Sequence, residues 1–136
     1  MTIEERRKLA NAGDVTAQDY LGVCYQHGMG VAKDEREAVR LYKLAADQGY
    51  ANAQSNLGLC YRHGTGVTKN VKEAICLYKL AADQGDANSQ YLLGFCYDFG
   101  IGVDTDETEA VRLYKLAADQ GDTYAQNALR RMGIAK

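Results

Sequence analysis

The chain has 136 residues, of which 46% are hydrophobic and 25% are charged, and its formal net charge is −2. The length suits a single domain covering residues 1–136, and the composition is that of a folded globular protein rather than a disordered or collagen-like chain. The nearly balanced charge gives no electrostatic reason to expect nucleic acid or an anionic membrane as a partner. One feature is unusual: the chain has 14 glycines and no proline, and it has serine only at Ser55 and Ser89, so these glycines do not form flexible linkers.

The chain begins with a charged segment. Residues 1–8 lack the apolar core of a secretory signal, and no apolar run approaches the roughly 18 residues that a membrane-spanning helix needs. We therefore expect a cytoplasmic protein with reduced cysteines, and a secreted or host-delivered form stays open. Residues 1–12 are predicted to form a polar capping helix.

Glycines recur along the chain with a spacing of 36 residues. This spacing divides it into three units, at 13–48, 49–84 and 85–120. A period of this length is typical of stacked helical repeats. The recurring glycines are Gly13, Gly49 and Gly85; Gly22, Gly58 and Gly94; Gly28, Gly64 and Gly100; and Gly30, Gly66 and Gly102.

The first half of each unit is predicted to be a helix. In the first unit, Ala17, Leu21 and Cys24 follow one another at i, i+4 and i+7, which places them on one helix face. Gly22 lies inside this helix, where glycine costs about 1 kcal/mol relative to alanine. Because the glycine recurs in every unit, we expect another helix to approach closely at this point.

The second half of each unit is predicted to be a second helix after a glycine-containing loop. Residues 28–31 contain two glycines, which allow the first helix to end in a left-handed residue and the chain to return. Asp34 is followed three residues later by Glu37, which is the pattern of a capping box. Asn70 and Asp106 begin the second helices of the other two units in the same way.

Residues 121–136 repeat the beginning of a unit. Ala125 and Leu129 keep apolar core positions, but Arg130 stands at the position of the interior glycine. A polar outer face of this kind predicts a capping helix at the C-terminal end.

These units require one another, because a single helix pair cannot bury its apolar face alone. The sequence therefore predicts an all-α fold. We expect a right-handed α-solenoid of antiparallel helix pairs, with three full 36-residue repeats and a capping helix at each end.

The repeated pattern resembles the Sel1-like repeat over residues 13–120. In the second unit the matching residues are Ala53, Leu57, Gly58, Tyr61, Gly64, Gly66, Val67, Ala74, Leu77, Tyr78, Ala81, Ala82 and Gly85. The resemblance implies a scaffold that binds protein segments on its concave surface, as adaptors do in protein quality control, bacterial signalling and bacterium–host contact. One branch of the family, with paired cysteines in every repeat, is associated with β-lactam binding or hydrolysis, and the single recurring cysteine here matches it poorly.

Two Cys–His pairs are the strongest candidates for chemistry. Cys24 precedes His27 by three residues, and Cys60 precedes His63 by three, a spacing that can begin a metal site or a nucleophilic pair. The third unit breaks the series with Phe99, and the recurring cysteines lie on the predicted core face, where a thiol acts as a small hydrophobic group. We therefore expect no metal, no cofactor and no catalytic residue.

The cysteines are predicted to be free thiols in two environments. Packed helix axes lie about 8–10 Å apart, whereas the Cα atoms of a disulfide lie about 4.4–6.8 Å apart, so the core cysteines should not pair. Cys76 takes the place of Arg40 and Arg112 in the other units, so its thiol should face solvent.

A binding groove is predicted where the units differ. Four positions on each first helix share a face beside the core, and by analogy with related solenoids this face is concave. Asparagine amides there can bond to an extended peptide backbone, and the apolar side chains can receive those of a ligand. The alternative is that the apolar members pack against the neighbouring second helix. The predicted groove residues are Tyr20, Val23, His27, Asn52, Asn56, Leu59, His63, Asn88, Leu92, Phe95, Phe99 and Tyr124.

The sequence thus favours an adaptor that binds a peptide or protein segment. Three alternatives stay open: a chain that self-associates weakly through exposed rings or open solenoid ends, an engineered repeat scaffold without a natural partner, and a β-lactam-processing enzyme.

Overall fold

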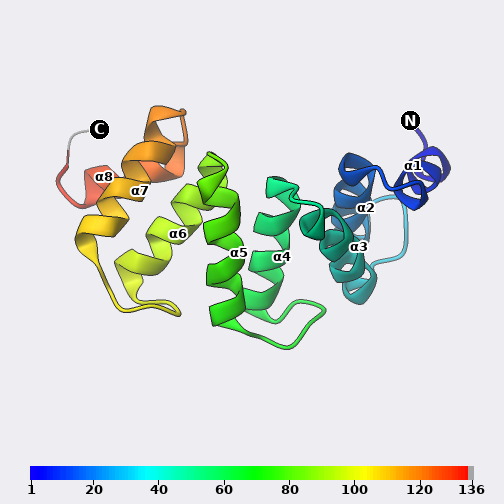
Figure 1. The fold of residues 1–136 in the computed structure, drawn as a ribbon, viewed down its shortest axis with the longest axis horizontal. Coiled ribbons are helices and arrows are strands. Elements are labelled where there is room, and N and C mark those ends of the chain that lie inside the picture. Colours follow the sequence, from blue (N-terminus) through cyan, green and yellow to red (C-terminus); the bar gives the residue numbers. More distant parts are fainter. Residues whose placement is uncertain (135–136) are drawn as a thin grey trace.

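The computed structural model describes residues 1–134 and is all-α (Figure 1). Within these residues eight helices follow one another along the long axis of the molecule, with the two termini at opposite ends, and the main contacts join helices adjacent in the chain. The predicted helical solenoid is therefore confirmed, and so are its flanking helices, although the last two residues of the 121–136 segment lie outside the described residues. The helices are α1 (Ile3–Asn11), α2 (Val15–His27), α3 (Glu35–Asp47), α4 (Ala51–His63), α5 (Val71–Asp83), α6 (Ala87–Phe99), α7 (Glu107–Asp119) and α8 (Thr123–Arg131).

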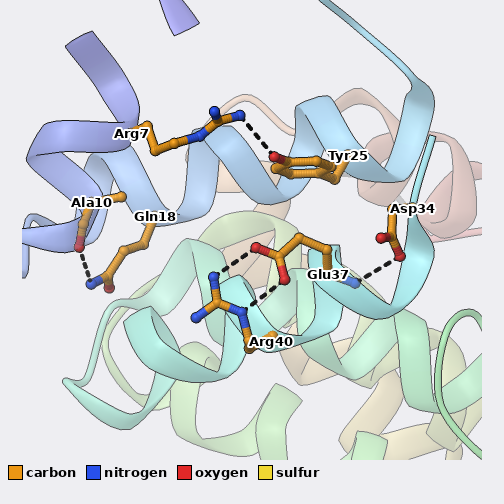
Figure 2. Close-up of polar contacts among 7 residues, drawn as sticks. All are labelled: Arg7, Ala10, Gln18, Tyr25, Asp34, Glu37 and Arg40. Carbon is orange, nitrogen blue, oxygen red and sulfur yellow. Dashed lines mark hydrogen bonds and ion pairs between the residues drawn. The ribbon is translucent and has the colours of Figure 1, made fainter. Parts of the chain in front are cut away.

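The second helices begin where the sequence predicts, but with half of the expected capping box. The Asp34 carboxylate accepts a hydrogen bond from the Glu37 backbone N–H at 3.1 Å (Figure 2). The Glu37 side chain does not reach back to Asp34 and instead accepts two hydrogen bonds from Arg40, at 2.6 and 2.8 Å. The box is equally incomplete in α5, where Cys76 stands at the position of Arg40, so an arginine is not needed for its reciprocal half to be missing. A complete box, with both reciprocal bonds, occurs at the start of α1 between Thr2 and Glu5.

The interior glycine of each first helix makes room for a buried tyrosine of the second helix. A Cβ atom on Gly22 would lie 2.5 Å from Cε1 of Tyr42, and one on Gly58 would lie 2.6 Å from Cε1 of Tyr78. The two helices of a repeat therefore approach so closely that only glycine fits, which confirms the predicted close approach. Gly94 stands in the same relation to Tyr114.

Buried glutamines link each repeat to its neighbours. The Gln18 side chain, on α2, donates to the Ala10 carbonyl of α1 at 3.0 Å and accepts from the Gln48 amide, at the end of α3, at 3.1 Å (Figure 2 shows the first of these bonds). One side chain thus connects three successive helices. The bond from the second-helix glutamine recurs from Gln84 to Gln54 and from Gln120 to Gln90. These glutamines recur every 36 residues, a signal that the sequence analysis did not use.

The ends of the solenoid replace the tyrosine–glycine contact with arginines. Arg6 occupies the position equivalent to Tyr42, and its guanidinium lies over the Tyr20 ring, 3.6 Å from the centroid. Arg7 donates to the Tyr25 hydroxyl at 2.9 Å (Figure 2). At the other end Arg130 takes the glycine position, and among the described residues no second helix follows that would need the space.

The cysteines lie where the sequence predicts. Cys24, Cys60 and Cys96 are buried free thiols in the core, and Cys76 is exposed. Among the described residues, no helix is long and apolar enough to cross a membrane.

Candidate functional site

The predicted groove residues lie on α2, α4, α6 and α8, which are the first helices of successive repeats. Seven of them are exposed, namely Tyr20, His27, Asn52, His63, Asn88, Phe99 and Tyr124. Val23, Asn56, Leu59 and Phe95 are half-buried, and Leu92 is buried. Within this set the structure forms a polar part, made by the asparagines of α4 and α6, and an aromatic part on α6 and α8.

In the polar part, asparagines join neighbouring repeats. Asp19, on α2, accepts hydrogen bonds from the amide of Asn52 at 2.6 Å and from that of Asn56 at 3.0 Å, both on α4. Asn88, on α6, donates in the same way to the Ser55 hydroxyl at 3.0 Å. Each amide therefore spends one of its two N–H donors on the preceding repeat, so the predicted use of these amides toward a peptide has to rely on their other polar atoms.

Asp19 is a buried carboxylate, and its environment shows in its pKa. Burial raises the pKa of Asp19 above its usual range, and the hydrogen bonds from Asn56 and Asn52 oppose this rise. The desolvation effect is the larger one, so the two asparagines only partly compensate for the burial of this charge.

In the aromatic part, rings gather between α6 and α8. The centroid of Tyr91 lies 5.6 Å from that of Tyr124 and 6.1 Å from that of Phe95, and the centroids of Phe95 and Phe99 are 4.6 Å apart. These are ordinary distances for interacting aromatic side chains. Phe99 and Tyr124 nevertheless leave 51% and 68% of their surface exposed, so the cluster presents apolar surface to solvent.

The aromatic cluster surrounds a hollow of about 230 Å³. We call it the aromatic hollow, and its lining residues are Tyr91, Phe95, Phe99, Tyr114, Tyr124, Asn127, Ala128 and Arg131. The periodicity explains why it lies here. Ala128 stands 36 residues after the buried Leu92 and 72 after Asn56, so the three residues occupy equivalent positions. Helix α8 therefore carries only a methyl group where α4 and α6 carry larger side chains.

Two guanidinium groups flank the cluster. Arg62 lies over the Phe95 ring at 5.0 Å from its centroid, and Arg131 lies over the Phe99 ring at 5.2 Å. Arg131 also forms an ion pair with Asp98, which accepts a further hydrogen bond from the Tyr114 hydroxyl at 2.9 Å. The Asp98 carboxylate is therefore already bound twice within the protein.

Both arginines act electrostatically on Tyr91, which lines the hollow. Burial raises the pKa of Tyr91, Asp122 and Tyr124 add to this rise, and Arg62 and Arg131 oppose it. Asp122 itself caps α8, where its carboxylate accepts the Tyr124 backbone N–H at 2.9 Å.

Arg62 carries a structural cost that its equivalents avoid. The Tyr42 hydroxyl donates to Gln26 at 2.7 Å and the Tyr114 hydroxyl donates to Asp98. Arg62 holds the same position in the second repeat, and a guanidinium can only donate. It lies near the Tyr78 hydroxyl but short of hydrogen-bonding geometry, so this buried hydroxyl has no hydrogen-bond partner among the described residues.

The sequence analysis found part of this site and missed the rest. Phe95, Phe99 and Tyr124 were predicted, whereas Tyr91, Tyr114, Asn127, Ala128 and Arg131 were not. The sequence did contain a signal for Tyr91, because Asp19, Ser55 and Tyr91 occupy equivalent positions in successive repeats. Each contacts a predicted groove residue of the next repeat: Asn52, Asn88 and Tyr124, respectively. Tyr20, at the far end, is covered by Arg6 and lies outside the aromatic cluster.

The two members of each Cys–His pair lie in different environments. Cys24 and Cys60 are buried, whereas His27 and His63 are exposed. Burial raises the pKa of Cys60 to about 11, so its thiol stays protonated at neutral pH. In the part of the chain that the structure describes, no three metal-ligating side chains gather in one place.

A second hollow, of about 300 Å³, lies on the side of the second helices α5 and α7. Charged side chains line much of it, and two of them, Glu109 and Arg112, already bind each other at 2.6 Å. It offers less apolar surface than the aromatic hollow, so the aromatic hollow is the stronger candidate site.

Comparison with known proteins bears directly on the repeats. The Sel1 repeat family model matches residues 15–50, 51–86 and 87–122, which are stretches of the predicted length that start two residues after the predicted unit boundaries. No curated protein matches the chain at a significant level.

Solved structures share the fold. A Sel1 repeat protein from Oxalobacter formigenes is 40% identical over 84% of this chain, with a TM-score of 0.79. A protective antigen of uropathogenic Escherichia coli with an SLR fold is 36% identical over 95% of this chain, with a TM-score of 0.90. The chain spans 47% and 28% of the lengths of these two structures. Cysteine-rich protein B of Helicobacter pylori is 21% identical over 95% of this chain and 98% of its own, with a TM-score of 0.74, which indicates a shared fold.

Proposed function

This chain belongs to the Sel1 repeat family, and from that premise we propose that it is a scaffold that binds a peptide or protein segment along the face formed by its first helices. The observation that carries the proposal is the aromatic hollow. It is lined by five aromatic side chains from three helices, and two of these rings are more than half exposed. Exposed aromatic side chains around a hollow are typical anchor points for a partner's apolar side chain.

The size of the hollow supports a side chain as its occupant. Pockets for drug-sized ligands and cofactors enclose about 300–1,000 Å³, whereas this hollow encloses about 230 Å³. The remaining predicted groove residues on α2 and α4 would then contact flanking parts of the same segment. In this proposal Asn52, Asn56 and Asn88 contribute the polar atoms that they do not use toward the preceding repeat.

The proposed role is non-catalytic. It is supported by the burial of the recurring thiols and by the raised pKa of Cys60 and Cys96, both about 11. A nitrocefin hydrolysis assay tests the β-lactam alternative directly, and turnover above that of a buffer control would contradict a purely binding role.

Selection from a random peptide library tests the binding proposal. Peptides enriched on the wild-type chain should bind at least about tenfold more weakly to a Phe99→Ala/Tyr124→Ala variant, because two aromatic anchors are removed. The matched control is Leu44→Ala/Leu80→Ala, which truncates two exposed apolar side chains on the second helices. Peptides that bind all three proteins equally would place the binding surface elsewhere.

Self-association is the second candidate, because the same exposed rings could bind another copy of the chain. Sedimentation velocity across a concentration series distinguishes the two. A dimer that dissociates in the Phe99→Ala/Tyr124→Ala variant would favour self-association over binding of a foreign segment.

A further inference from the structure

We infer that the segment bound at the aromatic hollow is acidic: it inserts an apolar side chain beside Ala128 and places a carboxylate against the Arg62 guanidinium. This inference rests on the proposed function and specifies its ligand. Three features carry it, namely the shape of the hollow, the distribution of charge around it and the structural cost of Arg62.

The shape of the hollow calls for an apolar side chain. In the third repeat the equivalent of Ala128 is Leu92, whose side chain is buried between neighbouring helices. At Ala128 that volume is missing, and rings surround the space that remains. A leucine-sized or aromatic side chain from a partner would fill this space with the contacts that Leu92 makes within the chain.

The charges around the hollow favour an acidic segment. Asp98 is bound by Arg131 and by the Tyr114 hydroxyl, and Asp122 is bound to the backbone of α8. Both nearby carboxylates thus have partners within the chain, and the charge of Asp122 still acts on Tyr91. Arg62 instead lies over a ring face, which does not satisfy the five N–H donors of a guanidinium. A partner's carboxylate is the group that these donors bind best.

The cost of Arg62 indicates that folding alone does not explain this residue. In the first repeat the equivalent residue is Gln26, whose side-chain oxygen accepts a hydrogen bond from the Tyr42 hydroxyl. Arginine leaves the buried Tyr78 hydroxyl without an acceptor, which is destabilising. Local departures from the best folding choice are expected at functional positions.

Tryptophan-containing peptides provide the test, because the chain has no tryptophan of its own. Three probes are compared: acetyl-Glu-Glu-Trp-Glu-Glu-amide, the same peptide with glutamine in place of glutamate, and the same peptide with lysine. Each probe is held at constant concentration while the protein is added, and its tryptophan emission is followed. The acidic probe should bind most tightly, with a blue-shifted emission, and added salt should weaken its binding.

Two variants separate the hollow from the charge. Ala128→Leu fills the hollow and should abolish binding of all three probes. Arg62→Gln keeps the hollow and supplies the residue found in the first repeat, so it should fold normally. This variant should bind the acidic probe about three- to fivefold more weakly than the wild type and bind the glutamine probe equally well. Arg112→Gln, on the side of the second helices, is the matched control and should change the affinity for neither of these two probes.

The outcomes separate the inference from the function on which it rests. If the glutamine or lysine probe binds as tightly as the acidic one, or if Arg62→Gln weakens all probes equally, the acidic ligand is wrong while the hollow still serves as an anchor. If no probe binds, or if Ala128→Leu leaves binding intact, both the acidic ligand and the hollow as the binding site are refuted.

Discussion

The three buried tyrosines of the second helices form a natural experiment in hydrogen bonding. Tyr42, Tyr78 and Tyr114 occupy equivalent positions with buried rings, but their hydroxyl groups have different surroundings. The first donates to Gln26 and the third to Asp98, whereas the hydroxyl of Tyr78 has no partner among the described residues. Replacing each by phenylalanine removes only the hydroxyl, so the three changes in unfolding free energy should differ in a defined order.

The expected magnitudes follow from these contacts. Tyr42→Phe loses a neutral hydrogen bond and should destabilise the protein by about 1 kcal/mol. Tyr114→Phe loses a bond to a carboxylate and should cost about 1.5–3 kcal/mol, toward the lower end because Arg131 still binds Asp98. Tyr78→Phe removes an unpaired buried hydroxyl and should be neutral or stabilising by up to about 1 kcal/mol.

Arg62 provides the internal control for this series. Arg62→Gln supplies an acceptor and should stabilise the protein by about 1 kcal/mol. In that background Tyr78→Phe should become destabilising by a similar amount, so that the double-mutant cycle shows coupling between the two positions.

Urea unfolding followed by far-UV circular dichroism measures all of these variants, provided that their m-values agree. The reasoning would be refuted if Tyr78→Phe destabilised the wild-type chain as much as Tyr42→Phe does, or if the effect of Tyr78→Phe were the same with arginine and with glutamine at position 62.

Three further predictions test other parts of the structure. Gly58→Ala should destabilise the protein by about 1–2 kcal/mol in urea unfolding, although alanine favours helix by about 1 kcal/mol, because its Cβ would lie 2.6 Å from the Tyr78 ring; a stabilised variant would contradict the close packing. At neutral pH a thiol reagent should modify one cysteine quickly, Cys76, and the three buried cysteines only on unfolding; two or more fast thiols would contradict the burial. Because burial raises the pKa of Asp19, the native state binds more protons than the unfolded state between the ordinary and the raised value, and stability falls as pH rises through that window. The unfolding free energy of Asp19→Ser, measured with urea, should therefore rise relative to that of the wild type as pH rises through the same window. An identical dependence of stability on pH in the two proteins would argue against a raised pKa.

Much of the fold could be predicted because its determinants recur in the sequence. The spacing of Gly22 and its equivalents predicted a close helix crossing, and the structure supplied the tyrosine that fills it. Asp34 and its equivalents marked the starts of the second helices correctly. The reciprocal half of the capping box was wrong: Glu37 binds Arg40 instead, and Glu73 does not reach back either, although Cys76 stands at the arginine position there.

The candidate site was predicted less completely. Variation between units pointed to Phe95, Phe99 and Tyr124, which the structure brings to one hollow. It also pointed to Asn52 as free to bind a peptide, whereas an amide N–H of Asn52 is bound to Asp19 of the preceding repeat. The use of these residues toward a ligand stays a prediction.

The sequence by itself determined the repeat length, the helices and their caps, and which residues form the core, because these depend on local geometry and on a pattern that returns every 36 residues. Only the tertiary structure decided where the surface is hollow and which charges are already bound. The hollow depends on the volume that Ala128 lacks beside rings from other helices. The cost of Arg62 depends on the hydroxyl of Tyr78, 16 residues away in the chain. Such properties arise from distances between side chains that are remote in sequence, which a periodic pattern does not contain.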